Sequence, residues 1–275
     1  MTTITNRFNT LLLVLLVLMA GAIITMLATR AYGGPLDPTG PPASTDGVLT
    51  PGTPISSLPF ATTQGGYYYV TRALSALAGQ SGITICCSNT TVDLGGFTIT
   101  GAGVGMSPGD GISNPGARNI VIRNGAVRGW FNGINLGGTD SRVDGVQASS
   151  NTVNGIKIGA QSEISDCNVS LNGQLGIDIT YGTVRNCTAT ENDTGIVLEN
   201  NALVEDSHVN SNRNVGISTN ADNNTVRNNE LSGNRNFDIS VFGTGNVVRE
   251  NVYCSLSNAG TNTIFTGNVD RIDAC

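Results

Sequence analysis

Hydrophobic and polar positions recur with a period of about 21 residues through the middle and C-terminal part of the chain. The units carry these apolar anchor residues: Val143, Ile164, Val184, Val204, Val226 and Val248. Most units also contain a Gly-Ile pair, at Gly133-Ile134, Gly155-Ile156, Gly176-Ile177, Gly195-Ile196 and Gly216-Ile217, with Asp238-Ile239 as the variant. Apolar residues alternate with other residues after each pair, which predicts strands with one buried face. One coil cannot bury such a face alone, so the period predicts a solenoid of stacked coils.

An asparagine stands eight positions after five of the anchors. These residues are Asn151, Asn172, Asn192, Asn212 and Asn234. Because the side-chain amide both donates and accepts, we predict a structural role in which each asparagine bonds the same turn in neighbouring coils. The repeated glycines are expected to supply backbone angles that a Cβ would forbid. Together these features predict an all-β fold, a single-stranded right-handed parallel β-helix of about eight or nine coils.

The leucine-rich repeat is the rival interpretation, because it shares the spacing of the anchor, the +3 and +5 positions and the +8 asparagine. In that fold a helix or 3₁₀ segment fills the rest of each unit. Here the rest is Gly-Ile-x-Ile followed by Gly, Thr and Asn, which suit strand and turn. Leucine is also scarce at the repeat positions, so the β-helix is favoured.

Three regions are predicted along the chain. Residues 1–32 contain an apolar run from Leu11 to Leu27 after Arg7, and they are either a cleaved signal peptide or an uncleaved N-terminal membrane anchor. Residues 33–57 are rich in Pro, Gly and Thr and read as a linker. Residues 58–275 are assigned to the β-helix domain. Both interpretations of the leader place this domain outside the cytoplasm, secreted or associated with the cell envelope.

The two ends of the β-helix domain are expected to differ from its middle. Tyr67 to Val70 is predicted to be an N-terminal cap strand, and the pattern Ile264, Gly267, Val269 predicts a short C-terminal coil. One coil carries extra residues around Gly101 to Gly116, and insertions of this kind leave a solenoid on one face.

Segments before the regular repeats carry a family resemblance. Gly82-Ile-Thr-Ile85 and Val92-Asp-Leu-Gly-Gly-Phe-Thr-Ile99 resemble the opening of bacterial secreted proteins built of right-handed parallel β-helix repeats, of the pectate-lyase-like, carbohydrate-associated superfamily. The resemblance covers roughly residues 55–270. It is specific for architecture and poor for function, because that superfamily includes lyases, hydrolases, epimerases and adhesins.

Charge limits the classes of partner. The formal net charge is −6, and cleavage after Ala31 would remove Arg7 and Arg30, leaving 12 minus 20, or −8. This sign disfavours nucleic acid as a partner and gives no electrostatic help in capturing acidic polysaccharides. The expected partner is a polysaccharide or the cell envelope, with membrane contact only through an uncleaved leader. Nothing in the sequence indicates an oligomeric state.

Six cysteines in an exported chain permit disulfides, and connectivity cannot be read from sequence. Cys167 and Cys187 hold the same position in adjacent coils, where they could form a bridge or remain two buried thiols. Cys254 and Cys275 could equally tie the tail to the last full coil. Cys86 and Cys87 are neighbours at a bend and are not expected to bridge each other. No Cys/His metal spacing appears, so no metal site and no cofactor is predicted, and a bound divalent cation is left open.

The candidate catalytic side chains are those that point outward from the Gly-Ile strands. Lys157 and Asp178 would be neighbours there, with Tyr181 three positions further on, and such groups could serve lyase or epimerase chemistry on uronic acids. The alternative is an ordinary cross-strand ion pair. Asn135 in the same column and Trp130, the only tryptophan, are candidates for sugar binding, although Trp130 could instead fill a bend.

Two hypotheses for function follow. The first is an exported, non-catalytic β-helix protein that presents a regular surface to glycans or to the envelope. The second is a polysaccharide lyase or epimerase acting at the face of Lys157, Asp178 and Tyr181. The Asp-Pro-His-Asp element of mannuronan epimerases and the Gly-His-Gly and Arg-Ile-Lys elements of polygalacturonases are absent. An enzyme should show loops rising on both sides of the face, whereas a binding module should be flat.

Overall fold

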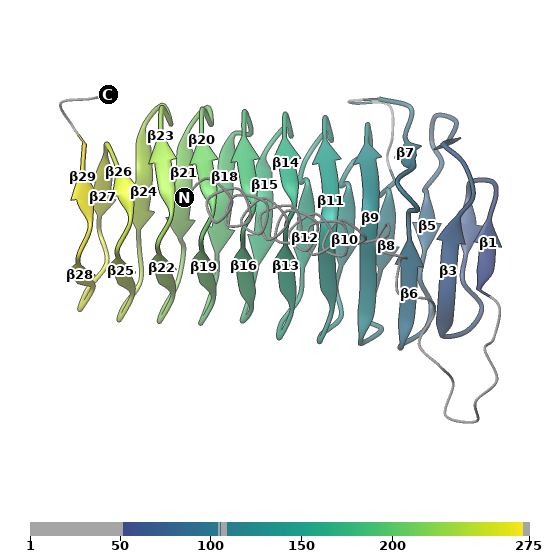
Figure 1. The fold of residues 1–275 in the computed structure, drawn as a ribbon, viewed down its shortest axis with the longest axis horizontal. Helices are drawn as coiled ribbons and strands as arrows, with labels where there is room; N and C mark the ends of the chain where they lie inside the picture. Colours follow the sequence, from purple (N-terminus) through teal and green to yellow (C-terminus); the bar gives the residue numbers. More distant parts are fainter. Residues whose placement is uncertain (1–51, 104, 106–108, 272–275) are drawn as a thin grey trace, which may run out of the picture. The chain divides into compact units, whose positions relative to one another are not determined.

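The computed structural model describes residues 52–103, 105 and 109–271. The predictions for residues 1–32 and for most of the 33–57 linker therefore lie outside the described residues. Every regular element in the described part is a strand, and all of the strand pairings are parallel (Figure 1). None of these residues forms a helix that is long and apolar enough to cross a membrane.

The strands form a 19-stranded sheet that contains two columns and a 10-stranded sheet that contains one. We call these columns face 1, face 2 and face 3. Face 1 contains β1 (Thr53–Ile55), β3 (Gly66–Val70), β6 (Thr90–Asp93), the first halves of β9 (Ile120–Arg128) and β11 (Arg142–Ser149), β13 (Glu163–Ser165), β16 (Thr183–Arg185), β19 (Leu203–Glu205), β22 (Thr225–Arg227), β25 (Val247–Arg249) and β28 (Ile264–Thr266). Face 2 contains β4 (Leu74–Ser75), β7 (Thr98–Thr100), the second halves of β9 and β11, β14 (Asn168–Ser170), β17 (Thr188–Thr190), β20 (His208–Asn210), β23 (Glu230–Ser232), β26 (Val252–Tyr253) and β29 (Val269–Asp270).

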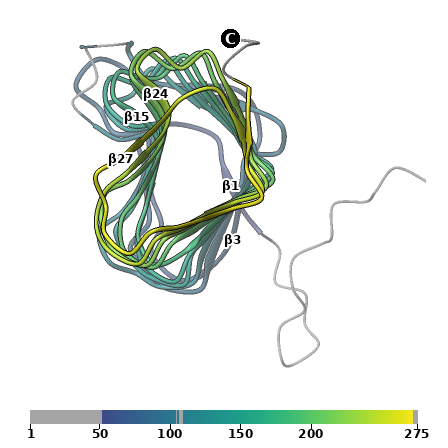
Figure 2. The same cartoon turned by 90° about the vertical axis from the view of Figure 1, so that its left-hand side faces the viewer.

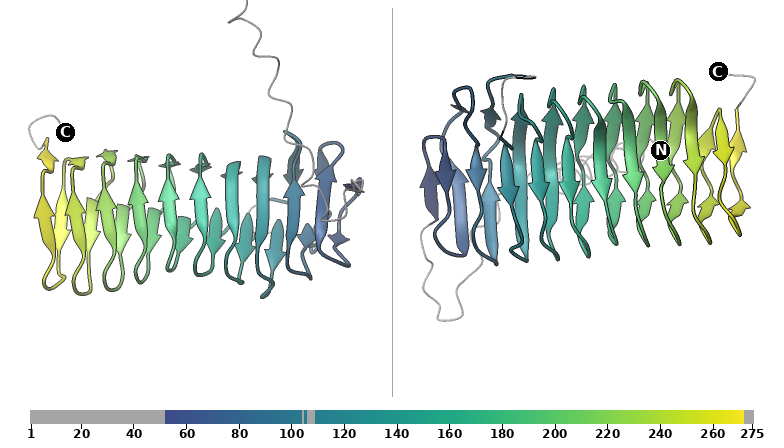
Figure 3. Two further views of the ribbon diagram at one scale, coloured as in Figure 1. Left: turned by 60° about the horizontal axis from the view of Figure 1, so that its bottom comes forward. Right: turned by 180° about the vertical axis from the view of Figure 1, so that it is seen from behind.

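Face 3 is the 10-stranded sheet, with one strand in each coil. It contains β2 (Phe60–Ala61), β5 (Ile83–Thr84), β8 (Ile112–Asn114), β10 (Ile134–Leu136), β12 (Ile156–Ile158), β15 (Leu175–Ile179), β18 (Thr194–Leu198), β21 (Val215–Thr219), β24 (Phe237–Val241) and β27 (Leu256–Asn258). The three faces enclose one interior, which Figure 2 shows end-on and Figure 3 shows from two further sides. The predicted parallel β-helix is confirmed.

The core consists of apolar columns that run along the stack. On face 3 the inward residues Ile134, Ile156, Ile177, Ile196, Ile217 and Ile239 are all fully buried. Each such side chain contributes about 1.5–3 kcal/mol relative to an exposed one. The anchor residues of face 1 form a second column of the same kind, with Val143 paired to Ile164 and Ile164 to Val184.

The five repeat asparagines form one buried ladder at the bend between faces 2 and 3. The Nδ2 of each of the first four asparagines donates to the Oδ1 of the next one, for example from Asn151 to Asn172 at 2.9 Å and from Asn172 to Asn192 at 2.9 Å. The same Oδ1 also accepts the backbone N–H of the preceding asparagine. Because each amide thus bonds its neighbours in the stack, the ladder satisfies polar groups that the bend would otherwise bury unpaired.

The repeated glycines serve close packing, and the expectation that they supply unusual backbone angles is wrong for these positions. None of the glycines in the Gly-Ile pairs has a positive φ. A Cβ added at Gly195 would instead lie 2.6 Å from the carbonyl oxygen of Gly216 and 2.8 Å from Nδ2 of Asn212. Gly176 meets its neighbouring coil in the same way. A side chain here would therefore push adjacent coils apart.

Asp238, the variant of the Gly-Ile pair, ends the asparagine ladder. Its buried carboxylate accepts hydrogen bonds from Nδ2 of Asn234 at 2.7 Å and from the backbone N–H of Cys254 at 2.7 Å. The following coil is short and supplies no further asparagine at this bend. The carboxylate therefore takes the place of the next amide oxygen in the column.

The ends of the solenoid differ from the predicted arrangement. Tyr67 to Val70 lies in β3, which pairs with β1 on one side and β6 on the other, so it is an interior strand and not a cap. β1 itself lies inside the predicted linker segment. In the last coil Phe265 pairs with Val248, so the inward residue is Phe265 and not Ile264. The predicted register of that coil is wrong by one residue.

Candidate binding site

The predicted outward column is present on face 3. Asn135 pairs with Lys157, Lys157 with Asp178 and Asp178 with Val197 across strands β10, β12, β15 and β18. On both sides of Lys157 in sequence lie buried isoleucines, so its side chain must point away from the core. The register holds because these coils are nearly equal in length, and it brings the polar side chains into one row.

A surface hollow of roughly 350 Å³ lies over this row. Its polar lining comprises Asn135, Lys157, Asp178, Thr180 and Glu199, and the glycines at the ends of β10 and β12 widen it. Lys157 Nζ lies 2.8 Å from Oδ2 of Asp178, and the exposed fractions of these side chains are 52% and 12%. The pair therefore presents a half-exposed ammonium group beside a mostly buried carboxylate.

Asn135 is oriented by the coil before it. Its Nδ2 donates to Oδ2 of Asp110 at 2.8 Å, and Oδ1 of Asp110 accepts from Nδ2 of Asn132 at 2.8 Å. These bonds fix which side of the Asn135 amide faces the hollow. Asp110, which sequence reasoning overlooked, thus supports the row from the bend before β8.

Tyr181 is not brought into the hollow. It lies at the bend after β15 with a φ of 49°, its side chain is 48% exposed, and it is not one of the lining residues. The left-handed backbone of the bend turns the chain away from the direction of the strand. The structure therefore assembles Lys157 and Asp178 without the third member of the predicted constellation.

Glu199 takes a place in the hollow that sequence reasoning missed. It follows directly after β18, two residues beyond Val197, and the outward column alone did not include it. A period-2 extension of the strand would have pointed to it, because residues i and i+2 face the same side.

Trp130 cannot stack on a sugar in this structure, so the binding role considered for it is wrong. Its side chain is fully buried, and Nε1 donates to the carbonyl oxygen of Ile99 at 3.3 Å. Its backbone N–H donates to Oδ1 of Asn151 at 3.1 Å. Trp130 therefore fills the bend at the start of the asparagine ladder, which was the other interpretation.

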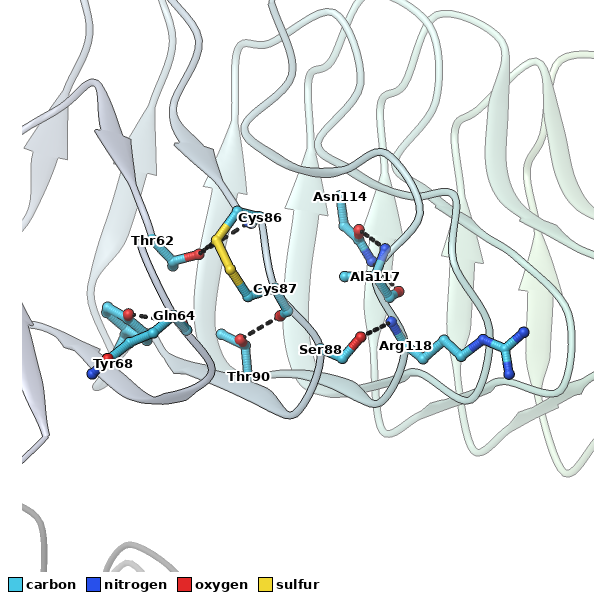
Figure 4. The surroundings of a disulfide bond; sticks show 10 residues. All are labelled: Thr62, Gln64, Tyr68, Cys86, Cys87, Ser88, Thr90, Asn114, Ala117 and Arg118. Atoms are coloured by element: carbon cyan, nitrogen blue, oxygen red, sulfur yellow. Dashed lines mark hydrogen bonds between the residues drawn. A yellow bond between two sulfur atoms is a disulfide. The ribbon is translucent and has the colours of Figure 1, made fainter.

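Cys86 and Cys87 form a disulfide, contrary to the expectation that they would not bridge each other (Figure 4). They lie between β5 and β6, where the chain bends. In a strand successive side chains point to opposite faces, but a bend allows two neighbours to meet. Thr62 and Thr90 hold this bend, since Thr62 Oγ1 accepts from the Cys86 N–H at 3.0 Å and Thr90 Oγ1 donates to the Cys87 carbonyl at 2.6 Å.

The other cysteines divide between thiols and a disulfide. Cys167 and Cys187 are buried free thiols in adjacent coils, which is one of the two alternatives considered for them. Cys254 is disulfide-bonded, and Cys275, its candidate partner, lies outside the described residues. The hydrogen bond with Cys187 and burial raise the pKa of the Cys167 thiol well above its ordinary value.

We expect Cys167 to resist alkylation in the native protein. A raised pKa leaves little thiolate at pH 8, and burial denies the reagent access. Mass spectrometry after iodoacetamide treatment should find Cys167 and Cys187 unmodified until urea is added. Rapid labelling of either residue without denaturant would contradict this structure of the core.

A second hollow, of roughly 330 Å³, lies on the outward side of face 2. Its lining includes Asp206, His208, Glu230 and Glu250. His208 Nδ1 lies 3.5 Å from Oε2 of Glu230, in the next coil. This contact was not predicted from the sequence, although the 22-residue spacing of the two coils would have indicated it. Among the described residues no group of His, Cys, Asp and Glu is arranged to hold a metal ion.

The three stacked faces and the outward polar rows define the class of protein as a parallel β-helix. The chain belongs to the right handed beta helix region family, whose model matches residues 81–230 and 132–270. The helix is accordingly right-handed. A comparison with curated proteins finds no match.

Solved structures share the fold at low sequence identity. The Dettilon tailspike protein is 15% identical over 78% of this chain and 60% of its own, with a TM-score of 0.56. The A-module of the Azotobacter vinelandii mannuronan C-5 epimerase is 13% identical over 79% of this chain and 87% of its own, with a TM-score of 0.56. The catalytic domain of an alpha-1,3-glucanase in complex with nigerose is 14% identical over 78% of this chain and 51% of its own, with a TM-score of 0.53.

Proposed function

We propose that this is an exported polysaccharide-binding protein that holds its ligand in the hollow of face 3 without transforming it. The observation that carries the proposal is the row of Asn135, Lys157 and Asp178, which presents donors and acceptors at adjacent rungs of one hollow. A shaped hollow with a few convergent polar groups is the usual form of a site for a polar ligand. Export is supported by the predicted leader and by disulfide-bonded cysteines.

The surroundings of the hollow favour binding over turnover. The bends after β12, β15 and β18 are short, so the coils raise no loop on that side. On the other side the insertion approaches the solenoid, where the Gly105 N–H donates to Oγ1 of Thr152 at 3.0 Å. A hollow with no raised loop beside the bends after β12, β15 and β18 is closer to the flat surface expected of a binding module than to an active site with loops on both sides.

Lyase or epimerase chemistry is less well supported by the geometry. Proton abstraction needs a base within reach of the substrate and a second group to complete the transfer. Tyr181 does not line the hollow, and the Asp-Pro-His-Asp element is absent although the fold is shared with a mannuronan C-5 epimerase. Lys157 is left with its partner carboxylate and no further acid or base from the predicted set.

Glycoside hydrolysis is the second candidate function, because the hollow contains two carboxyl groups. Asp178 and Glu199 belong to adjacent coils and are offset by two residues along the strand. Diagonal neighbours of this kind have Cα atoms about 7–8 Å apart. Glycosidases use two carboxyl groups roughly 5–9.5 Å apart, and Asp178 and Glu199 supply two carboxyl groups from neighbouring coils to one hollow.

Replacing Lys157 should test the binding proposal. We expect Lys157→Ala to weaken binding of a neutral polysaccharide by roughly 10-fold, since it removes a charged donor and leaves Asp178 unpaired. Affinity electrophoresis or calorimetry against a panel of neutral, amine-bearing and uronic-acid polymers measures this. Arg235→Ala, which removes an exposed charge at the bend before β24, is the matched control and should bind like the wild type.

The same incubations separate binding from turnover. Reducing-end release that disappears in Asp178→Asn would replace the binding proposal with hydrolysis, and unsaturated products would replace it with a lyase. Absence of binding to every polymer would contradict both candidate functions.

A further inference from the structure

We infer that the glycan bound at face 3 carries no carboxylates and that amine-bearing sugars are preferred, with Glu199 as the residue that sets this preference. The inference rests on the proposed binding function and adds the charge class of the ligand to it. It follows from the balance of charged groups around the hollow, which runs against the uronic-acid polymers considered for the lyase and epimerase alternative.

Carboxylates outnumber cations in the lining. Lys157 is the one cation among the lining residues, and Asp178 already pairs with it at 2.8 Å. Glu199 adds a second carboxylate to the lining, and Asp110 a further one behind Asn135. A ligand in the hollow therefore meets an excess of negative charge. A uronate would be repelled by it, whereas a sugar ammonium group would be attracted.

Glu199 is available to a ligand. It is half-buried, and Nδ2 of Asn220 donates a long hydrogen bond of 3.5 Å to its Oε1. It takes part in none of the ion pairs within the described residues. Arg213, a cation of the following coil, is held elsewhere. Its guanidinium donates to the carbonyl oxygens of Asn172 and Gly173 at the bend that precedes β15, at the opposite end of the strand from Glu199.

The hollow on face 2 has the same sign. Asp206, Glu230 and Glu250 line it together with His208, its single basic group. Arg271 approaches Glu230, with 3.8 Å between Nη1 and Oε1, and Arg249 approaches Glu250, with 3.7 Å between Nη1 and Oε1. These contacts offset two of the three carboxylates and leave Asp206. Neither hollow therefore offers a polyanion a net positive surface, and a uronate excluded from face 3 would not find a better site on face 2.

The test compares one polymer in two charge states and a polyanion of similar length. The full chain is titrated at about 10 mM and at 1 M salt with a chitosan oligosaccharide, with its fully N-acetylated form, and with an oligogalacturonate of the same length, at a pH at which the glucosamine amines are protonated. At low salt we expect chitosan to bind about two- to fivefold more tightly than the acetylated polymer, the range of one exposed ion pair, and the oligogalacturonate to bind most weakly. The preference should vanish at 1 M salt, where the screening length is about 3 Å.

Glu199→Gln supplies the decisive comparison. It should bring chitosan and the acetylated polymer to near equal affinity at low salt without abolishing binding. Glu191→Gln, which neutralises an exposed carboxylate at the preceding bend, should leave the preference intact.

Three results would overturn the inference. These are equal binding of the two polymers by the wild type, tighter binding of the oligogalacturonate, and an unchanged preference in Glu199→Gln. Each would contradict the inferred charge of the ligand and leave the proposed binding function intact. If the wild-type protein bound none of the polymers, that result would instead contradict both the proposed function and this inference.

Discussion

Gly195→Ala is expected to destabilise the protein by about 3 kcal/mol or more. The added Cβ would lie 2.6 Å from the carbonyl oxygen of Gly216 and 2.8 Å from Nδ2 of Asn212. These atoms belong to the backbone of the next coil and to the buried ladder, so neither can move without changing the spacing of the stack. Overpacking of this kind costs about 1–3 kcal/mol, and weakening a buried hydrogen bond adds about 1 kcal/mol.

Urea unfolding followed by circular dichroism measures this loss. Gly116→Ala is the matched control, because a Cβ at Gly116 has no heavy atom within 4 Å and its φ is not positive. We expect that variant to remain within about 0.5 kcal/mol of the wild type. Similar midpoints for Gly195→Ala and the wild type would contradict the close contact between coils.

Asn192→Ala should cost about 3 kcal/mol for a different reason. Oδ1 of Asn192 accepts from the backbone N–H and from Nδ2 of Asn172, and its own Nδ2 donates to the carbonyl oxygen of Val169 and to Oδ1 of Asn212. Removing the amide leaves buried polar groups unpaired on both sides. Each such group costs about 1–3 kcal/mol, and partial rearrangement or entry of water keeps the total below the sum.

The control for the ladder is Asn168→Ala, because Asn168 is exposed on β14. It should change the free energy of unfolding by less than about 0.5 kcal/mol. Thermal and urea unfolding of the two variants would show whether the loss is specific to the ladder. Equal effects of Asn168→Ala and Asn192→Ala would mean that the buried amides add nothing beyond strand propensity.

The regular coils could be predicted from sequence because their signals reinforce one another. Three features recur at the same period: the valine and isoleucine anchors, the bend asparagines such as Asn192, and the close-packed glycines such as Gly195. Any one of them therefore sets the register of the others. The irregular ends lack this redundancy. Asp238 takes the position of a glycine and ends the ladder because the next coil is short, and only the three-dimensional contacts with Asn234 and Cys254 reveal that role.

The candidate site was predictable where it depended on strand register and not where it depended on bends. Lys157 and Asp178 lie 21 residues apart in equivalent strand positions, so the pairing followed from the period. Tyr181 itself has a left-handed backbone, with a φ of 49°, which redirects its side chain. The Cys86–Cys87 disulfide lies at the bend between β5 and β6. Bend directions are set by individual backbone angles, which a repeat pattern does not specify.

Nuclear magnetic resonance can map directly where a glycan contacts the protein. The isotopically labelled chain is titrated with a chitosan oligosaccharide, and the amide and side-chain shifts are followed. We expect the shifted signals to cluster at four residues on face 3, namely Asn135, Lys157, Asp178 and Glu199. A cluster at His208 and Glu230 on face 2, or no shifts at saturating oligosaccharide, would contradict this expectation.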